Sequence, residues 1–202
     1  MITIINYGIG NLGSIFNMFD YLGIESKIEN DPDKILKAKK ILLPGVGSFD
    51  AAMIKINETK DLKDVLNEKV LIEGTPILGI CLGMQLMTSS SEEGNLDGFN
   101  WIPAQTKIFS KKKNLKVPHM GWNDVNISTP SVLTKGLSDN SRYYFVHSYY
   151  VHVENPNHSI LKTNYDVNFD SGIAYKNIFG LQFHPEKSHT FGMEILKNFS
   201  EI

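Results

Sequence analysis

The chain contains one cysteine among its 202 residues, and the neighbours of that cysteine have the features of a nucleophilic site. Cys81 is the centre of a Gly-x-Cys-x-Gly pattern at Gly79–Gly83, directly after a short apolar run. A hydrophobic strand, a sharp turn between glycines and a helix that begins at the turn form a nucleophile elbow. The positive end of the helix dipole favours a thiolate, and the free N–H groups there can stabilise an oxyanion. A buried structural cysteine is the alternative, because free cysteines are often buried.

A histidine and a glutamate much further along the chain supply the other two groups of a nucleophilic triad. His184 and Glu186 flank Pro185, after an apolar segment at Ile178–Phe183 that we expect to lie beside the elbow strand. A histidine at this place can take the proton of the thiol and later protonate a leaving amine. The glutamate can hold the imidazole in the required tautomer. By itself, the His-Pro-Glu segment is also consistent with a surface loop.

A glycine-rich segment at Pro44–Gly47 is the third element that could take part in catalysis. It follows a predicted parallel strand, and α/β proteins bind their ligands at the carboxyl edge of such strands. Its N–H groups could complete an oxyanion hole. Without the other two motifs, a plain strand-to-helix loop explains this segment equally well.

One further motif indicates a different class of enzyme. Gly8, Gly10 and Gly13 form a Gly-x-Gly-x-x-Gly pattern between a predicted strand and a predicted helix. Glu29 and Asp31 follow at about the distance of a ribose-binding acid, which favours a dinucleotide-binding oxidoreductase. The chain has little room for a separate substrate domain, however, and this hypothesis leaves the cysteine elbow and the His-Pro-Glu segment unexplained.

The elements that must position these residues alternate between strand and helix in the first part of the chain. Buried apolar runs predict strands at 2–6, 24–28, 41–43 and 77–80, and apolar residues at helical spacing predict helices near 15–22, 48–56 and 61–69. This alternation is typical of a parallel sheet that is covered by helices on both faces.

The second part of the chain has a different character. Aromatic and β-branched runs predict strands at 99–109, 143–146 and 149–151, a hairpin joining 173–175 to 178–183, and a last helix at 190–199. We interpret Lys111–Lys113 as a solvated turn rather than a binding patch. The prediction is an α/β fold, with a mostly parallel central sheet flanked by helices and an antiparallel β extension, in a single domain of residues 1–202.

Composition and charge limit the classes of function. The net charge of −2 gives no overall attraction to nucleic acid or to an anionic membrane. No apolar run approaches the ~20 residues of a membrane span, and the N-terminus lacks the basic region of a signal peptide. A single cysteine fits a reducing cytoplasm, and the six histidines show no paired ligand spacing. We therefore expect a cytoplasmic protein that uses neither a metal ion nor another cofactor.

Together, the elbow, the glycine-rich turn and the distant His-Pro-Glu resemble the class I (triad) glutamine amidotransferases. Further blocks resemble one branch of them, the glutaminase subunits of imidazole glycerol phosphate synthase. These blocks run in order along the whole chain, and they are Tyr7–Leu12, Pro44–Phe49, Gly79–Leu86, Ser91–Gly94, Val117–Asn123, Phe145–Tyr150 and Gln182–Ser188.

The resemblance implies a role for each matching residue. Cys81 would attack the side-chain amide of glutamine, His184 would act as base and then acid, and Glu186 would orient His184. The oxyanion hole would be formed by the N–H groups of Leu82 and of the turn at Val46 and Gly47. The substrate glutamine would be held by Gln85, Glu93, Ser148 and Tyr149.

The resemblance also implies a partner. Ammonia would pass to a cyclase subunit, a (β/α)8 barrel of histidine biosynthesis, and the two chains would form a heterodimer. An enclosed path is needed because free ammonia is protonated at neutral pH and diffuses away. The residues that would face the partner are Gly10, Asn11, Met120, Trp122, Asn123 and Lys187.

Two positions depart from the pattern of this branch. Gly13 stands where many relatives have a basic residue, and Asp166 stands where glycine is expected. A paralogous glutaminase subunit, which supplies ammonia to an amidotransferase of surface sugars, is therefore kept as an alternative. A degenerate regulatory subunit is a further alternative, against which the intact Cys81, His184 and Glu186 argue.

Overall fold

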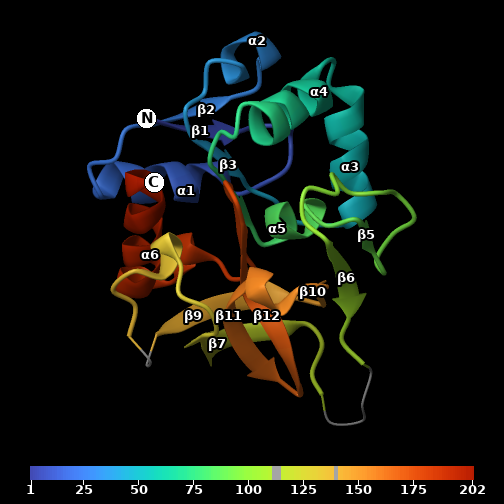
Figure 1. Ribbon diagram of the computed structural model, residues 1–202, viewed down its shortest axis with the longest axis vertical. Helices are drawn as coiled ribbons and strands as arrows, with labels where there is room; N and C mark the ends of the chain where they lie inside the picture. The colour runs from blue at the N-terminus through green and yellow to red at the C-terminus, as the bar shows by residue number, and fades with distance from the viewer. Residues whose placement is uncertain (111–114, 139–140) are drawn as a thin grey trace.

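A sheet of eight strands forms the centre of the protein, which the computed structural model describes for residues 1–110, 115–138 and 141–202 (Figure 1). Five neighbouring strands are parallel, and the last three are antiparallel to the strands beside them. In their order across the sheet they are β2 (Ser26–Glu29), β1 (Ile2–Ile5), β3 (Ile41–Leu43), β4 (Ile77–Ile80), β13 (Ile178–Leu181), β12 (Val167–Tyr175), β11 (Ser159–Tyr165) and β8 (Asn126–Ile127).

Helices cover both faces of the parallel part, and its inner strands β1, β3, β4 and β13 are buried on both sides. Ile4 and Leu42 belong to one core, and their neighbours Ile5 and Leu43 belong to the other. Nearly continuous apolar runs are typical of such inner strands, whereas the edge strand β2 is only partly buried. The helices are α1 (Leu12–Tyr21), α2 (Pro32–Ile35), α3 (Phe49–Glu58), α4 (Leu62–Asn67), α5 (Leu82–Leu86) and α6 (His189–Glu201).

The two cores separate the helices by face. Phe19 of α1 and Phe199 of α6 pack in one core, whereas Met53 of α3 and Leu66 of α4 pack in the other. Figure 1 accordingly shows α1 and α6 on one side of the sheet and α3 and α4 on the opposite side. In the described part of the chain, no helix is long and apolar enough to cross a membrane.

Two small sheets extend the molecule beside the antiparallel strands, in the lower part of Figure 1. One joins β10 (Tyr149–Val153), β6 (Ala104–Ile108) and β5 (Ser90–Ser91), and the other pairs β7 (His119–Asp124) with β9 (Arg142–His147). A mostly parallel central sheet with an antiparallel extension confirms the predicted fold class.

The agreement with the predicted elements is uneven. The strands at 41–43 and 77–80 are β3 and β4, and the predicted hairpin is formed by β12 and β13. The predicted strand at 99–109 is shorter, because only Ala104–Ile108 pairs with a neighbour. Before it, Phe99 and Trp101 stack on each other with ring centroids 4.0 Å apart. The prediction for Lys111–Lys113 lies outside the described residues.

Asp166 forms the tight turn between β11 and β12, where the branch pattern has glycine. Its φ angle is +64°. This left-handed conformation is open to glycine without strain, and aspartate tolerates it better than most residues do. The departure at this position therefore leaves the hairpin intact.

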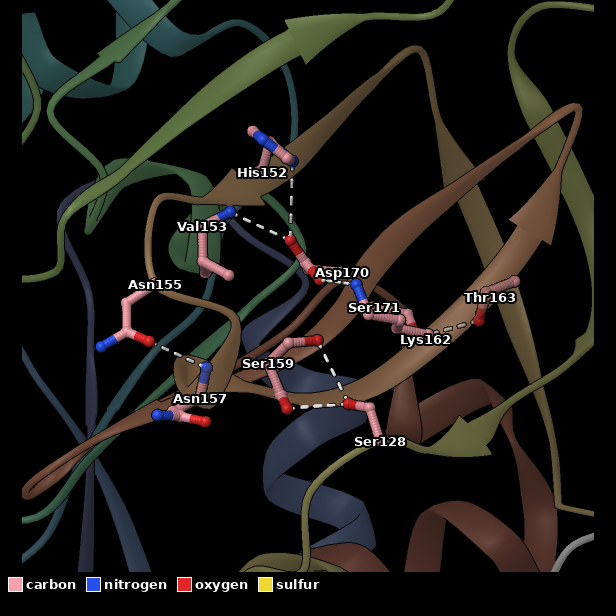
Figure 2. Close-up of polar contacts among 10 residues, drawn as sticks. All are labelled: Ser128, His152, Val153, Asn155, Asn157, Ser159, Lys162, Thr163, Asp170 and Ser171. Atoms are coloured by element: carbon pink, nitrogen blue, oxygen red, sulfur yellow. Dashed lines mark hydrogen bonds and ion pairs between the residues drawn. The ribbon is translucent and has the colours of Figure 1, made fainter.

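A buried carboxylate joins the central sheet to the three-stranded sheet (Figure 2). Asp170 of β12 accepts hydrogen bonds from the backbone N–H of Val153 at 2.9 Å and from Nζ of Lys162 at 2.7 Å. His152 lies further away, with Nδ1 at 4.0 Å from the carboxylate. Val153 is the last residue of β10, and Tyr149 is its first. The Asp170 side chain therefore anchors the strand that begins at Tyr149.

We predict that Asp170→Ala lowers the free energy of unfolding by about 2–3 kcal/mol, because the Val153 N–H is left buried without a partner. Urea denaturation of the two proteins measures the difference. The matched control is Glu58→Ala, which removes an exposed ion pair with Lys55 at 3.5 Å and should cost less than about 0.5 kcal/mol. Equal effects of the two substitutions would contradict the anchoring role of Asp170.

Candidate active site

The sharp turn at Cys81 connects β4 to α5 at the carboxyl edge of the sheet. Cys81 has φ +53° and ψ −110°, a conformation that L-residues rarely adopt. Its N–H donates to the carbonyl oxygen of Leu181 at 2.7 Å. β13 runs parallel to β4 with Leu181 opposite Ile80, so the residues that follow both strands meet at this edge.

Two glycines allow the elbow to pack against its own sheet. A Cβ atom on Gly83 would lie 1.9 Å from the carbonyl oxygen of Leu43, and one on Gly79 would lie 2.6 Å from the carbonyl oxygen of Gly83. Both distances are far below van der Waals contact. The pattern of glycines around Cys81 is therefore required by the close approach of α5 to β3 and β4.

His184 follows β13 and lies in the same pocket as Cys81. Its Nδ1 donates to Oε1 of Glu186 at 2.8 Å, because a carboxylate can only accept. Its Nε2 is buried and has no hydrogen-bond partner among the described residues. The Ser188 hydroxyl also donates to the His184 carbonyl oxygen at 2.6 Å, which fixes the backbone of this turn.

The charges around His184 favour its protonated form. Burial alone lowers the pKa of the imidazole, but the neighbouring Cys81 and Glu186 side chains outweigh burial and raise the pKa to about 10. Cys81 raises the pKa as a neighbour that can give up its proton and carry negative charge, and Glu186 raises it through its hydrogen bond to Nδ1 and its own charge. The arrangement can therefore accept a proton from the thiol and keep it as an imidazolium close to a thiolate.

The segment Pro44–Gly47 lies beside the elbow, as predicted for an oxyanion loop. The Tyr7 hydroxyl donates to the Pro44 carbonyl oxygen at 2.8 Å, and a Cβ atom on Gly45 would lie 2.8 Å from that hydroxyl. Gly47 has φ +92°, which favours glycine. Burial first, and then the proximity of Cys81, raises the pKa of Tyr7, so its hydroxyl stays a donor.

A pocket of about 330 Å³ opens in front of Cys81 and His184. The three residues expected in the oxyanion hole line it, and so do the four expected to bind glutamine. These lining residues are Val46, Gly47, Leu82, Gln85, Glu93, Ser148 and Tyr149. The structure therefore brings Cys81, His184 and the predicted oxyanion and substrate residues together around one space, with Glu186 bonded to the His184 ring.

Two of the pocket residues also have structural contacts. Gln85 donates from Nε2 to the Tyr149 carbonyl oxygen at 3.1 Å. Oε2 of Glu93 accepts the N–H of Phe49 at 2.8 Å and so caps the start of α3. Burial, together with the nearby Asp50, raises the pKa of Glu93 despite that hydrogen bond.

The residues predicted to face a partner are exposed or partly exposed, and one of them, Lys187, lines the pocket. Met120 and Trp122 of β7 are 62% and 40% exposed, and Lys187 is exposed beside the pocket. Gly10 and Asn11 form the loop between β1 and α1, and a Cβ atom on Gly10 would contact Pro44 at 3.4 Å. The Asn123 side chain is engaged within the protein, by His119 and by the backbone of Asn164.

Sequence reasoning missed several side chains that contact the site. Gln182 is fully buried, and its Nε2 lies 3.8 Å from Sγ of Cys81, whereas its Oε1 accepts from Gln85 at 3.2 Å. Tyr7 and the histidines His119 and His147 were also missed. All four belong to the motif blocks, but only the three-dimensional pairing of the strands gives each of them a partner.

Comparison with known proteins defines the class first. The family model described as glutamine amidotransferase class-I matches residues 3–202, and the chain belongs to this family. The imidazole glycerol phosphate synthase subunit HisH 2 of Methanococcus maripaludis is 52% identical over 199 residues, covering 98% of each chain. The subunit HisH of Bdellovibrio bacteriovorus is 44% identical over 205 residues, covering 100% of both chains. Within the class, the chain thus belongs to the family of HisH subunits.

Solved structures agree with this fold. PurLQS from Thermotoga maritima matches with a TM-score of 0.76 at 18% identity, over 98% of this chain and 96% of that chain. A structure described as a glutamine amidotransferase matches with a TM-score of 0.72 at 15% identity, over 100% and 98% of the two chains. At these identities the likeness concerns the fold alone.

We predict that Gly83→Ala lowers the free energy of unfolding by about 3 kcal/mol or more, because the added methyl group overlaps the backbone of β3. Thermal and urea denaturation measure this change. Gly13→Ala is the matched control: no atom lies within 4 Å of the added Cβ, and alanine in a helix should stabilise by up to about 1 kcal/mol. A neutral Gly83→Ala would show that the elbow is not packed as described.

We also predict that Glu186→Gln lowers the pKa of His184 by about one pH unit or more. The substituted glutamine side chain can still accept a hydrogen bond from Nδ1 of His184, but it carries no negative charge that favours the imidazolium. The His184 ring therefore loses its proton at a lower pH. An NMR titration of the His184 ring measures the midpoint. Glu68→Gln, at an exposed glutamate, should leave that midpoint where it is. An unchanged midpoint in Glu186→Gln would contradict the electrostatic role of Glu186.

Proposed function

We propose that this protein hydrolyses glutamine to glutamate and ammonia, with Cys81, His184 and Glu186 as the catalytic residues. The observation that carries the proposal is the parallel pairing of β4 with β13. It places the thiol and the imidazole at one edge of the sheet, in one pocket, with Nδ1 of His184 already bonded to Glu186 at 2.8 Å.

The reaction begins when His184 takes the proton of Cys81 at Nε2. The thiolate attacks the carbonyl carbon of the glutamine side chain, and the N–H groups of Leu82 and of the turn at Val46 and Gly47 stabilise the oxyanion. The C–N bond breaks as His184 returns the proton to the leaving amine, which departs as ammonia. Water, activated by His184, then hydrolyses the thioester and releases glutamate.

The substrate would lie between the elbow and the segment at Ser148 and Tyr149. Gln85 and Glu93 are polar groups of the same pocket and suit the amide and the α-amino end of glutamine. Burial raises the pKa of Glu93, which means that the ionised carboxylate is disfavoured in the empty pocket. A cationic group, such as the α-amino group of glutamine, would stabilise that ionised form.

We propose in addition that the ammonia is used by a cyclase subunit with a (β/α)8 barrel, in histidine biosynthesis, within a heterodimer. The family of HisH subunits and the exposed Met120 and Trp122 support this proposal. Lys187 lines the pocket, and Gly10, Asn11 and Asn123 complete the proposed docking surface. The matched family favours this partner over a surface-sugar enzyme and over a dinucleotide-binding oxidoreductase.

We further propose that residues 1–202 form one amidotransferase domain and that the protein works in the cytoplasm. The two hydrophobic cores share one central sheet, which supports a single folding unit. A reducing compartment keeps a reactive thiol such as Cys81 free.

We predict that Cys81→Ala abolishes glutamine-dependent synthesis by the complex and leaves ammonia-dependent synthesis intact, because only the source of ammonia is lost. Both rates are measured with the cyclase subunit present, with glutamine or with an ammonium salt as donor. The unaltered protein should hydrolyse glutamine weakly alone and faster with its partner and the partner's ligand.

The matched control is Thr59→Ala, a substitution of a half-buried residue at the end of α3 and outside the pocket, which should change neither rate. If glutamine still serves as donor for Cys81→Ala, the nucleophile is another residue. Full glutaminase activity of the isolated chain would contradict coupling to a partner.

A further inference from the structure

Two buried histidines connect the exposed strand β7 to the pocket, and the reaction just described uses neither of them. His119 of β7 and His147 of β9 are 3% and 6% exposed. The two strands pair with these residues directly opposite each other. Nδ1 of His119 lies 2.9 Å from Nε2 of His147, so one ring must donate to the other.

The partners of the two rings fix the direction of every hydrogen bond. Nδ1 of His147 lies 2.7 Å from the Tyr149 carbonyl oxygen, which can only accept, so Nδ1 carries the proton. In neutral His147, Nε2 is then an acceptor, and His119 must donate to it from Nδ1. Nε2 of His119 in turn accepts from the Asn123 amide at 3.1 Å, and that amide also donates to the Asn164 carbonyl oxygen at 3.0 Å.

Both rings are held in the neutral form that this chain of hydrogen bonds requires. Burial lowers the pKa of His119 to about 4 and that of His147 to about 3. His119 is stacked between Tyr165 and Phe145, with ring centroids 3.9 Å and 4.7 Å away. A second proton on His147 would turn its Nε2 into a donor that faces the donor of His119.

The other end of the chain of hydrogen bonds reaches the nucleophile. The Tyr149 carbonyl oxygen also accepts from Nε2 of Gln85 at 3.1 Å. The same Nε2 donates to Oε1 of Gln182 at 3.2 Å, and Nε2 of Gln182 lies 3.8 Å from Sγ of Cys81. The Tyr149 carbonyl is therefore the point where the contacts of β7 and those of the pocket meet.

We propose that His147, His119 and Asn123 are positioning residues for glutamine binding, acting through the Tyr149 carbonyl group. The neutral histidine pair fixes the position of this carbonyl relative to strand β7. It thereby also fixes the pocket wall formed by Ser148 and Tyr149. This inference rests on the proposed glutaminase function. A purely packing role would explain why the two histidines are buried. It would not explain why every hydrogen bond from Asn123 through the two rings to the Tyr149 carbonyl donates in the same direction.

Two substitutions at His119 separate positioning from packing. In His119→Asn, the amide nitrogen takes the place of Nδ1 and can still donate to His147. In His119→Gln, the longer amide takes the place of Nε2, accepts from Asn123 and leaves His147 without its donor. Both variants lose the stacked ring, so the loss of packing is similar in the two.

The test measures glutamine hydrolysis by the complex with its cyclase partner. We expect a KM for glutamine about ten times higher in His119→Gln than in His119→Asn, as for the loss of one hydrogen bond, with kcat values within about threefold. His158→Gln, at a ring that packs on Tyr175 outside the pocket, is the control and should leave the KM unchanged. Equal KM values in the two His119 variants would overturn the positioning role.

A second measurement is independent of activity. The 15N chemical shifts of the imidazoles should show His147 as the neutral Nδ1–H tautomer down to about pH 5, in the isolated protein as well as in the complex. Titration of His147 near its ordinary pKa, or an Nε2–H tautomer, would overturn the inference. Absence of glutamine hydrolysis by the unaltered complex would instead overturn the proposed function, which distinguishes the two failures.

Discussion

The parallel pairing of β4 with β13 determines the geometry of the whole site. The hydrogen bond from the Cys81 N–H to the Leu181 carbonyl oxygen continues the β4–β13 hydrogen-bond ladder one residue beyond β4. This bond fixes the backbone position of Cys81. Because β13 ends at the same level, His184 has a fixed place in the same pocket as the thiol. Glu186 then follows in a 3₁₀ turn that starts at Pro185, so the third group of the proposed triad also derives its position from this strand.

Close packing of backbones accompanies this pairing and explains most of the glycines around the site. The elbow helix approaches β3 so closely that the Leu43 carbonyl lies where a side chain at position 83 would begin. The Tyr7 hydroxyl, after the end of β1, also donates to the Pro44 carbonyl oxygen. The turn that follows Pro44 is thus confined between the end of β1 and the elbow, although Gly47 itself has open space around it.

Particular residues show how far the sequence could be interpreted. β3 and β4 were predicted with their bounds because apolar residues fill both faces of a central parallel strand, which leaves little ambiguity. The candidate catalytic residues and the candidate oxyanion turn came from their motifs, and the candidate glutamine-binding residues came from the family resemblance. β7 and β11 were not predicted, since polar side chains such as His119, Asn123 and Asn164 interrupt any apolar alternation. Their roles come from cross-strand partners, and one sequence does not show which strands become neighbours.

The position of β13 in the sheet has a consequence for how the protein acquires its activity. β13 comes after every other strand in the chain, yet it lies between β4 and β12 and is the only strand that joins the parallel part of the described sheet to the antiparallel part. During synthesis, both parts can form before this strand is available, but neither can complete the edge where Cys81 lies. The proposed nucleophile is consequently synthesised about 100 residues before its proposed base, and the edge where both lie is complete only once β13 pairs with β4 and β12. Pairing of this kind depends on contacts between distant segments, which are slow to form.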